Sequence, residues 1–429
     1  MRILQINKFF HVRGGADGVF FKTCDLLAEH GHEVAHFSSR HAKNRPSPYE
    51  RYFVDGFNED DLQQVSFQRK VRAFVDGIYS LSARRNIRAL VAEFKPDVAH
   101  VHNLNYQLSP SIFDALHEAG VPIVMTLHDY GPICGAATMY LNGEICERCC
   151  GGSHYQVLIQ RCFHGSYAAS AMVMLNKYVH EARHSWRQVS LMISPSRFLR
   201  GKLVEYGAAE ERIVHLPNFV DFEAGESVQP QAGGYVLYLG RLSLNKGTET
   251  LLKATRGLNA SVVLLGDGPM RAAAEAEAAS RSGQLRVHPF TSSRAEIQKL
   301  IADSAFVVVP SEWYENQPTT ILEAYWMRKP VIASRLGGIP ELVEDGKTGL
   351  LFEPGDAADL RNKIDYLLAH SEVWQAWGDA GHEMIARNFN RERHYEKLMG
   401  IYRHVIHGDS LLELASPAAV DARAFAARP

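Results

Sequence analysis

The chain has 429 residues, 46% hydrophobic and 22% charged, and its 46 Lys or Arg residues and 48 Asp or Glu residues give a net charge of −2. This length allows two or three domains of about 150 residues, each large enough for its own core. The balanced charge argues against nucleic-acid binding. No apolar run approaches the ~20 residues that span a bilayer, and residues 1–7 predict a strand rather than a signal peptide, so we expect a cytoplasmic protein.

The first elements predict a β–α–β unit. Residues 2–7 form a short apolar strand, and the loop that follows ends in Gly14-Gly15. Residues 16–30 have helical periodicity, and residues 33–38 form the next strand. A two-glycine turn is explained by tight-turn geometry alone, so by itself the pair predicts no ligand.

Three further strands continue the pattern. They are predicted at residues 97–101, 123–127 and 189–194, with a helix at 109–118 between the first two. This alternation predicts an open, mainly parallel α/β sheet. Ligands bind beyond the carboxyl ends of the strands in such sheets, so residues that follow strands are candidates for a site.

Two histidines follow these strands. His128 stands in TLHDY after one strand, and His102 stands in HVHN after another. A neutral imidazole could bond sugar hydroxyls or move a proton, whereas a structural histidine bonds a neighbouring carbonyl. Strand position alone favours the structural interpretation for His128 and leaves both open for His102. We expect His100 on the opposite strand face, in packing.

Five of the six cysteines lie in an insert at about residues 130–165. Because thiols stay reduced in the cytosol, we expect no disulfide framework, but four thiolates could hold a tetrahedral structural zinc. The candidate ligands are Cys134, Cys146, Cys149 and Cys162. Their spacing is not that of a common zinc finger, so small apolar residues that pin a loop are the alternative. Because the insert follows His128, we expect it to cover the acceptor side.

Two basic amphipathic stretches predict contact with an anionic membrane surface. Residues 161–202 carry seven Lys or Arg residues against Glu181. In residues 66–88 only Asp76 opposes a group of basic residues, namely Arg69, Lys70, Arg72, Arg84, Arg85 and Arg88. The alternative is an ordinary solvated helix face packed on the sheet.

A second α/β series follows an interdomain connection at residues 216–234. Its first strand, at 235–239, leads into GRLSLNKG, in which Arg241 and Lys246 precede a helix. The two cations could neutralise pyrophosphate oxygens without a metal. Surface cations at such a junction are otherwise usually only solvated.

The most informative segment runs from residue 309 to residue 356. Glu315 and Glu323 have seven residues between them, at the start of a helix predicted to open at Pro318. We expect Thr319, Thr320 and Ile321 to offer free backbone N–H groups, to which a phosphate would bind. Two carboxylates beside an anion site suggest a diphosphate with hydroxylated groups at both ends, a nucleotide-sugar.

This segment resembles the donor-binding region of family 4 glycosyltransferases, retaining enzymes of the GT-B fold. The family pattern is E-x7-E, then PV(I/V)AS, GG-x-PE and G-x-x-G-L. The matching positions are Glu315, Glu323, Pro330 to Ser334, Gly337, Gly338, Pro340, Glu341 and Gly346 to Leu350. Asn316-Gln317-Pro318 stands where many members have Gly-Phe-Gly, so we expect a sugar pocket of different shape.

The resemblance implies roles for the residues already identified. Glu315 would bond the hydroxyls of the sugar and Glu323 the ribose, while Arg241, Lys246 and the helix N-terminus would hold the departing diphosphate. The strand that ends at Gly266, like the Gly14-Gly15 loop, would approach the donor. The family's T-x-H-D stretch lines the cleft, which reverses the preference and places His128 in the site.

The resemblance also implies the architecture, α/β with two facing Rossmann-like domains and a cleft between them. We predict an acceptor domain at residues 1–217, a nucleotide-sugar domain at 218–390, a helix crossing back at 391–410 and a mobile tail at 411–429. The predicted activity is metal-independent, retaining transfer of a sugar to a glycan or lipid-linked acceptor, in polysaccharide or glycolipid biosynthesis. Many relatives take lipid-linked acceptors, which keeps peripheral membrane association among the predictions.

Three alternatives remain at the sequence level. A sugar-nucleotide hydrolase or epimerase on the same scaffold would consume donor without an acceptor. An NAD-dependent oxidoreductase needs G-x-G-x-x-G after a strand, and neither Gly14-Gly15 nor the glycines at 266 and 268 complete that pattern. A non-catalytic scaffold would have no need of the two cations and two carboxylates.

Overall fold

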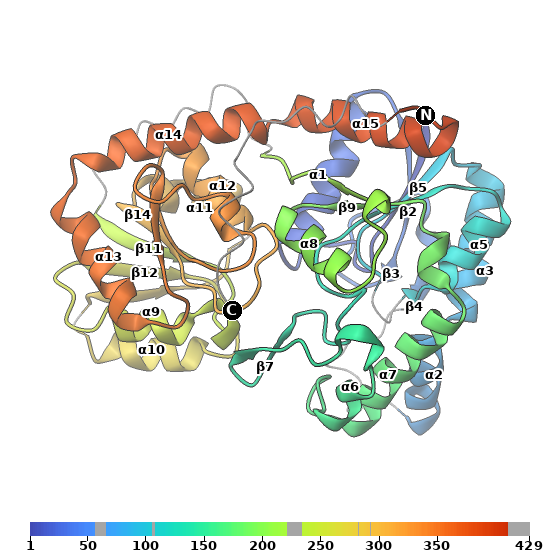
Figure 1. Ribbon diagram of the computed structural model, residues 1–429, viewed down its shortest axis with the longest axis horizontal. Helices are drawn as coiled ribbons and strands as arrows, with labels where there is room; N and C mark the ends of the chain where they lie inside the picture. Colours follow the sequence, from blue (N-terminus) through green and yellow to red (C-terminus); the bar gives the residue numbers. More distant parts are fainter. Residues whose placement is uncertain (56–65, 105–107, 221–233, 282, 292, 411–429) are drawn as a thin grey trace.

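The computed structural model describes residues 1–55, 66–104, 108–220, 234–281, 283–291 and 293–410 (Figure 1). Most of the predicted interdomain connection and the whole of the predicted tail at 411–429 lie outside these residues. Each of the two domains that are described is built on its own sheet.

The first sheet has six parallel strands in the order β10-β9-β6-β5-β1-β2. The strands are β1 (Arg2–Ile6), β2 (Glu33–Phe37), β5 (Val98–Val101), β6 (Ile123–Thr126), β9 (Leu191–Ser194) and β10 (Ile213–His215). The helices of this domain that pack against the sheet include α1 (Gly15–Glu29), α3 (Leu81–Phe94), α5 (Ser111–Glu118) and α8 (Arg197–Glu205). Because helices cover both faces, β5, β6 and β9 are buried along their whole length.

The second sheet also has six parallel strands, in the order β13-β12-β11-β14-β15-β16. Its strands are β11 (Tyr235–Leu239), β12 (Ser261–Leu265), β13 (Leu285–His288), β14 (Phe306–Val309), β15 (Val331–Ser334) and β16 (Gly349–Phe352). Its helices are α9 (Thr248–Ala254), α10 (Arg271–Ala279), α11 (Arg294–Ala302), α12 (Thr319–Trp326), α13 (Ala357–Ala369) and α14 (Val373–Asn388). Two hydrophobic clusters pack against this sheet. The prediction of two Rossmann-like α/β domains is confirmed.

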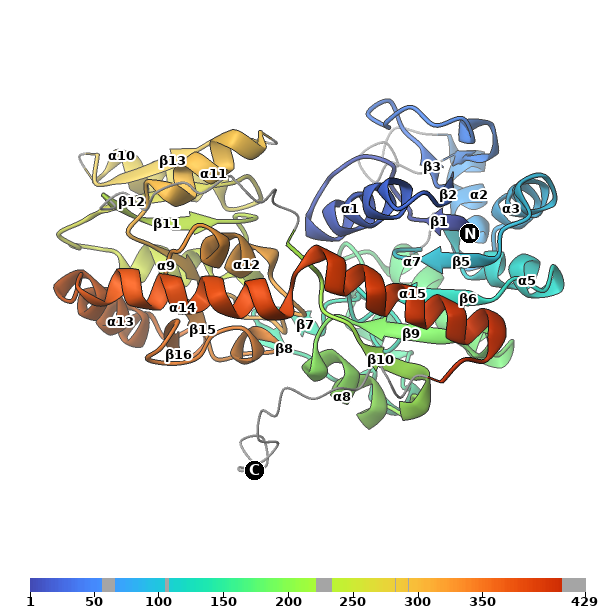
Figure 2. The same ribbon diagram turned by 90° about the horizontal axis from the view of Figure 1, so that it is seen from above.

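The last helix joins the two domains. Helix α15 (Arg391–His407) follows α14 and lies along the first domain, as Figure 2 shows. Its buried face, from Leu398 to Tyr402, packs with Ile3, Leu27 and Val98 of the first domain. The end of the chain that is described is therefore part of the first domain's core.

Three helices project from the first domain and form what we call the arm: α2 (Phe67–Ile78), α6 (Gln156–Ile159) and α7 (Tyr167–Ala182) (Figure 1). The insert precedes α6 and contains the short hairpin of β7 (Tyr140–Leu141) and β8 (Glu144–Ile145). Among the residues that the structure describes, no helix is both long enough and apolar enough to cross a membrane.

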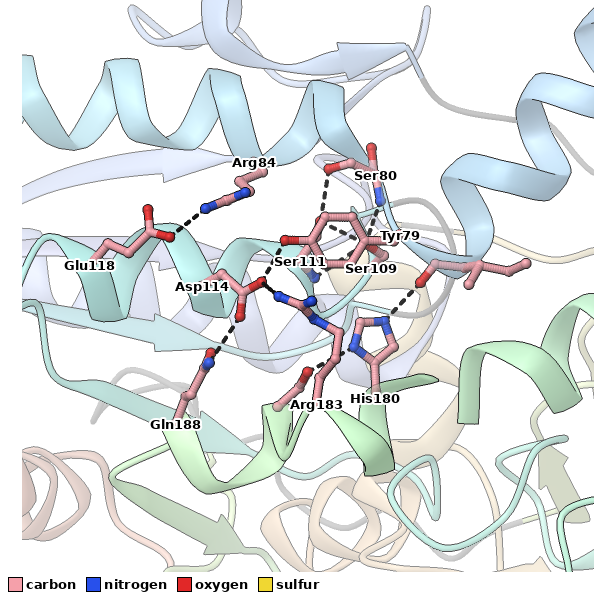
Figure 3. Close-up of polar contacts among 12 residues, drawn as sticks. Tyr79, Ser80, Arg84, Ser109, Ser111, Asp114, Glu118, His180, Arg183 and Gln188 are labelled. Carbon is pink, nitrogen blue, oxygen red and sulfur yellow. Dashed lines mark hydrogen bonds and ion pairs between the residues drawn. The ribbon is translucent and has the colours of Figure 1, made fainter. Parts of the chain in front are cut away.

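A buried carboxylate anchors the arm to the domain (Figure 3). Asp114 on α5 accepts hydrogen bonds from Tyr79 Oη at 2.5 Å, from Arg183 at 2.7 Å and from Gln188 Nε2 at 2.9 Å. Burial alone would raise the pKa of Asp114, but these hydrogen bonds and the Arg183 charge hold it below its ordinary value. The residues just beyond α2 and α7 therefore meet at one ionised side chain.

Candidate functional site

The loops of the second domain that carry the predicted site pack backbone against backbone. A Cβ added to Gly247, which has φ +70°, would lie 1.7 Å from the carbonyl oxygen of Pro310. One added to Gly266 would lie 1.9 Å from the carbonyl oxygen of Gly240. Glycine is required at both positions because any side chain would push the loops apart. The loops after β11, β12 and β14 thus hold one another in place.

The two predicted residues at the centre of this region form an ion pair. Lys246 Nζ lies 2.6 Å from Glu315 Oε1, and Ser311 Oγ donates to the same oxygen at 2.6 Å. Glu315 is 5% exposed. Burial would raise its pKa, but the Lys246 ammonium and the hydrogen bonds outweigh burial and keep the pKa below its ordinary value. The carboxylate is therefore ionised at neutral pH.

The N-terminus of α12 lies beside the first domain. The helix begins at Thr319 after Pro318, which provides no side-chain cap. The N–H group of Ile321 donates to Pro318 O at 3.1 Å, so the prediction that it would be free was wrong. The tight first turn uses that donor. A Cβ added to Gly15 would lie 3.7 Å from Thr319 Oγ1, so the first domain's glycine loop faces this helix start.

Other predicted donor residues lie around this helix and the strand ends. Glu323, one turn into α12, is half-buried, and burial raises its pKa against the opposing charges of Lys22 on α1 and Arg294 on α11. These two charges belong to different domains, so Glu323 faces both. Thr320 Oγ1 donates to Leu239 O at 3.4 Å, at the end of β11.

Two predicted residues stand apart from these contacts. Arg241 is exposed, and no hydrogen bond within the described residues joins it to the ion pair. Gly14 precedes α1 with open space where a Cβ would point, so its surroundings would tolerate a side chain. The structure brings Lys246 to Glu315, and Gly15 to Thr319, but does not bring Arg241 to the pair.

The first domain contributes histidines to the candidate site. His128 Nε2 lies 2.9 Å from His102 Nδ1, and their rings are stacked with centroids 5.2 Å apart. Burial lowers the pKa of His128 to about 4 and the pKa of His100 to about 3, and it also lowers the pKa of His102. All three imidazoles are therefore neutral at neutral pH.

The expectation for His100 was wrong. Its ring centroid lies 4.3 Å from that of His102, on the same face of the sheet. Side chains two residues apart in a strand point to the same face, since the strand period is two. His100 is thus part of the same buried polar group as His102, and it is not isolated packing.

An amide that the sequence marked only as a departure from the family pattern joins the domains. Asn316 Nδ2 donates to Leu127 O at 2.9 Å, and Asn316 Oδ1 accepts from Ser196 Oγ at 2.6 Å. Leu127 follows β6 and Ser196 follows β9, while Asn316 follows β14. The carboxyl edges of the two sheets therefore meet at this side chain.

A second contact between the domains uses the carboxylate of Glu341. Its two oxygens accept from the backbone N–H groups of Arg197, at 2.9 Å, and of Phe198, at 2.7 Å. These are the first residues of α8, whose N-terminus attracts an anion. Sequence reasoning quoted Glu341 only as part of a motif, because nothing local shows that its partners lie in the other domain.

The predicted zinc ligands lie close to one another in the insert. Cys134, Cys146, Cys149 and Cys162 line one small pocket, together with apolar side chains of the insert. Burial and the neighbouring thiols raise the pKa of Cys149 to about 12 and that of Cys162 to about 11. Within the described residues, no three His, Cys, Asp or Glu side chains are arranged to hold a metal ion. The zinc remains a prediction.

Comparison with known families covers almost the whole chain. The model described as Glycosyltransferase Family 4 matches residues 13–224, and the model described as Glycosyl transferases group 1 matches residues 221–384. The first match covers the glycine loop and the histidines, and the second covers the ion pair and α12.

Two curated relatives are similar over part of their length. Sulfoquinovosyl transferase of Arabidopsis thaliana is 28% identical over 328 residues, 71% of this chain and 56% of that protein. Alpha-D-kanosaminyltransferase of Streptomyces kanamyceticus is 31% identical over 182 residues, 40% of this chain and 45% of that protein. The chain spans about half the length of these relatives.

Solved structures share the fold at low sequence identity. Sucrose-phosphate synthase from Thermosynechococcus elongatus has a TM-score of 0.68 and 18% identity over 95% of this chain and 99% of that chain. HepE of Anabaena in complex with UDP-glucose has a TM-score of 0.62 and 16% identity over 93% of this chain and 98% of that chain. These likenesses establish the architecture of two facing domains.

Proposed function

This chain belongs to glycosyltransferase family 4 and has the GT-B fold, and we propose that it transfers a sugar, with retention of anomeric configuration, from a nucleotide-diphosphate sugar to a glycan or lipid-linked acceptor. One observation carries this proposal. The Lys246–Glu315 ion pair lies on the loops around the N-terminus of α12, and the glycine loop of the first domain faces that terminus. A structural neighbour that binds UDP-glucose supports the donor class.

The second domain would hold the donor and its leaving group. Lys246, the exposed Arg241 and the N-terminus of α12 would neutralise charge that grows on the diphosphate as the bond to the sugar breaks. Glu315 would accept hydrogen bonds from the hydroxyls of the sugar, and Glu323 would accept them from the ribose. None of these roles needs a metal.

The reaction would break the bond between the anomeric carbon and the phosphate oxygen. A bond to the acceptor oxygen would form on the same face of the sugar, and the acceptor's proton would pass to the departing phosphate. The products are the glycosylated acceptor and a nucleoside diphosphate. The departing diphosphate needs stabilisation of its charge, which suits the charged second domain. The acceptor molecule presents a neutral hydroxyl group, which suits the neutral histidines of the first domain.

A donor screen followed by product analysis tests the proposal. A nucleotide-sugar present at 100 times its dissociation constant stabilises the folded protein by about 2.7 kcal/mol, which a thermal-shift assay detects. With the donor known, NMR of the product gives the anomeric configuration. Donor consumption at the same rate with and without acceptors would favour a hydrolase or epimerase, and binding of no nucleotide-sugar would contradict the proposal.

We also propose that the arm contacts a membrane surface, through apolar more than basic side chains. Arg84 and Arg88 bind Glu118, and Arg183 binds Asp114, so those charges are already paired. The side chains of Arg69 and Lys70 lie outside the part that is described. Exposed apolar side chains gather instead on the three helices of the arm or directly before them: Val71, Val75, Tyr155, Ile159, Tyr167, Leu175 and Tyr178.

Sedimentation with lipid vesicles tests the membrane contact. Binding should persist on neutral vesicles and weaken in the variant Val75→Ser/Tyr167→Ser, because both side chains are more than half exposed on the arm. The matched control is Tyr366→Ser, which removes an exposed aromatic side chain from α13 in the other domain. Failure to bind neutral or anionic vesicles at low salt would exclude this contact.

We retain a structural zinc in the insert as a proposal, because four thiols from separate segments reach one pocket. Thiolate sulfur suits tetrahedral zinc. Metal analysis of protein purified without chelator should give close to one zinc per chain, and less than about 0.2 would exclude it.

A further inference from the structure

His100, His102 and His128 belong to a chain of side-chain hydrogen bonds that begins on the last helix. Tyr402 Oη on α15 lies 2.7 Å from His100 Nδ1 and 3.3 Å from Gln5 Nε2 on β1. Gln5 Oε1 lies 3.2 Å from His102 Nε2, and His102 Nδ1 lies 2.9 Å from His128 Nε2. The chain thus runs from the crossing helix to the histidine assigned to the site.

The chemistry of these groups sets where each proton lies. An amide oxygen only accepts, so His102 Nε2 must carry the proton that it shares with Gln5 Oε1. A neutral imidazole has one ring proton, so His102 Nδ1 accepts and His128 Nε2 donates. His128 then keeps an unprotonated nitrogen, Nδ1.

The orientation of the Gln5 amide selects this order. Its nitrogen donates to Tyr402 Oη, whose own proton goes to His100 Nδ1, and His100 Nε2 donates to Thr126 Oγ1 at 2.8 Å. If the amide were turned over, every bond in the chain would reverse and the His128 proton would move to Nδ1. The amide of Gln5 on β1 therefore decides which ring nitrogen of His128 is unprotonated.

His128 Nδ1 can be reached from outside the core. His128 is half-buried, and within the described residues its ring makes one hydrogen bond, at Nε2. Nδ1 has no hydrogen-bond partner among the described residues, and it is not one of their fully buried polar atoms. It is therefore accessible. Leu127, the preceding residue, contacts Asn316 of the second domain, so this nitrogen lies at the edge where the two domains meet.

We propose that Gln5 and Tyr402 are positioning residues that act on His128 through His102. They hold the proton of His128 on Nε2, so that Nδ1 accepts a hydrogen bond from a hydroxyl group of the sugar or of the acceptor. This proposal rests on the proposed function only for the identity of the hydroxyl. Helix α15 thereby contributes to the site through Tyr402, although its sequence lies far from every residue assigned to it.

The test is the tautomer of His128 in the free protein, measured by NMR on ¹⁵N-histidine-labelled protein with the signal assigned through His128→Gln. We expect the Nε2–H tautomer in the wild type. Tyr402→Phe and Gln5→Met, which remove hydrogen-bonding groups but keep apolar volume, should each convert it to a mixture of the two tautomers. If Gln5→Met fails to fold, Tyr402→Phe decides.

The matched control is Tyr395→Phe, on the same helix. It also removes one hydrogen bond between a tyrosine of α15 and a histidine of the first domain. This bond joins Tyr395 Oη and His32 Nε2 at 2.9 Å and is not part of the hydrogen-bond chain that reaches His128. The control should leave the His128 tautomer unchanged. A His128 proton on Nδ1 in the wild type, or an unchanged tautomer in both test variants, would overturn the proposal.

Kinetics provide the second readout once a donor is known. Loss of one organised hydrogen bond should lower kcat/KM about 3- to 10-fold in Tyr402→Phe. The loss should include a higher donor KM where the hydroxyl belongs to the sugar, and should leave the donor KM within about twofold where it belongs to the acceptor. Unchanged kcat and unchanged KM values for donor and acceptor in Tyr402→Phe would overturn the role of His128 toward a substrate hydroxyl. The tautomer is read without substrate, so absence of sugar transfer would refute the proposed function and leave the tautomer result standing.

Discussion

The two domains fix their parts of the site by different means. In the second domain, glycine loops pack backbone against backbone, and the central pair, Lys246 and Glu315, is charged. In the first domain, a chain of neutral side chains fixes His128, and burial keeps its members uncharged. The charged half suits a diphosphate, which needs counter-charge, and the neutral half suits a hydroxyl, which needs a hydrogen-bond acceptor.

This difference has a consequence for tolerance to change. A loop held by glycine fails when any side chain is added, whereas a hydrogen-bond chain fails when one polar group is lost. The first failure is steric and independent of pH. The second involves titratable groups, so acid should affect the first domain before the second.

The largest expected effect is the steric one, from Gly247→Ala. The added methyl group would overlap the Pro310 carbonyl at a residue with φ +70°, and we expect a loss of roughly 3 kcal/mol or more in unfolding free energy. Denaturant unfolding measures it. Gly201→Ala on α8, where a Cβ meets nothing within 4 Å, is the control and should be neutral or stabilising. Equal stability of the two variants would contradict the packing argument.

Removal of the central charges should cost nearly as much, but in activity. Lys246→Ala and Glu315→Ala should each lower turnover at least about 100-fold, some 2.7 kcal/mol, with the fold retained. Because each leaves its partner uncompensated, the double variant should lose less than the sum of the two. Lys253→Ala, which breaks an exposed ion pair to Glu249 on α9, is the matched control. Near-normal transfer by either single variant would refute the assignment.

Acid should destabilise the first domain selectively. Burial lowers the pKa of His36 to about 4, so below about pH 6.5 the unfolded chain binds a proton that the folded protein does not. The unfolding free energy is therefore unaffected by the titration of His36 above pH 6.5, and it decreases as the pH falls toward 4. His36→Phe should therefore recover roughly 2 kcal/mol at pH 5 and nothing at pH 7.5, measured by denaturant unfolding.

Hydrogen exchange gives the same test by region. Other histidines whose pKa burial lowers to about 4 are His128 and His215 in the first domain and His394 on α15. Amide protection should accordingly fall in the first domain before the second between pH 7.5 and pH 5. Simultaneous loss in both domains would show that the contrast between them does not govern stability.

The smallest expected effect is at the contact between the two halves. Asn316→Ala removes two hydrogen bonds between the domains, and we expect roughly 1 kcal/mol less stability and a several-fold higher donor KM. Thermal unfolding and steady-state kinetics measure these changes. Asn388→Ala, an exposed amide at the end of α14, is the control. An unchanged donor KM in Asn316→Ala would mean that this contact does not support the donor site.

Much of the second domain's site could be predicted because its pattern is local. Lys246 stands at a strand–helix junction and Glu315 at a helix mouth, and both junctions lie at the carboxyl edge of one parallel sheet. Parallel strands bring such junctions together whatever their separation in sequence. The alternation of strands and helices predicted the α/β domains for the same reason.

The errors and omissions had different causes. Ile321 uses its N–H group inside the first turn of α12, and His100 lies on the same face as His102 because strand side chains alternate. The second error was avoidable from the sequence, since the two residues are two apart. Asn316 was noticed only as a departure, and its partners, Leu127 and Ser196, belong to the other domain.

The strands, helices, glycine turns and charged groups could be read from the amino-acid sequence, because each depends on neighbours within a few positions or on a repeated βα order. Tertiary structure alone decided which polar groups meet. Gln5 and Tyr402 bond across 397 positions, and Asn316 reaches Leu127 across 189. Buried polar groups must find partners, but which partner each finds depends on how whole elements pack, and no local pattern encodes that.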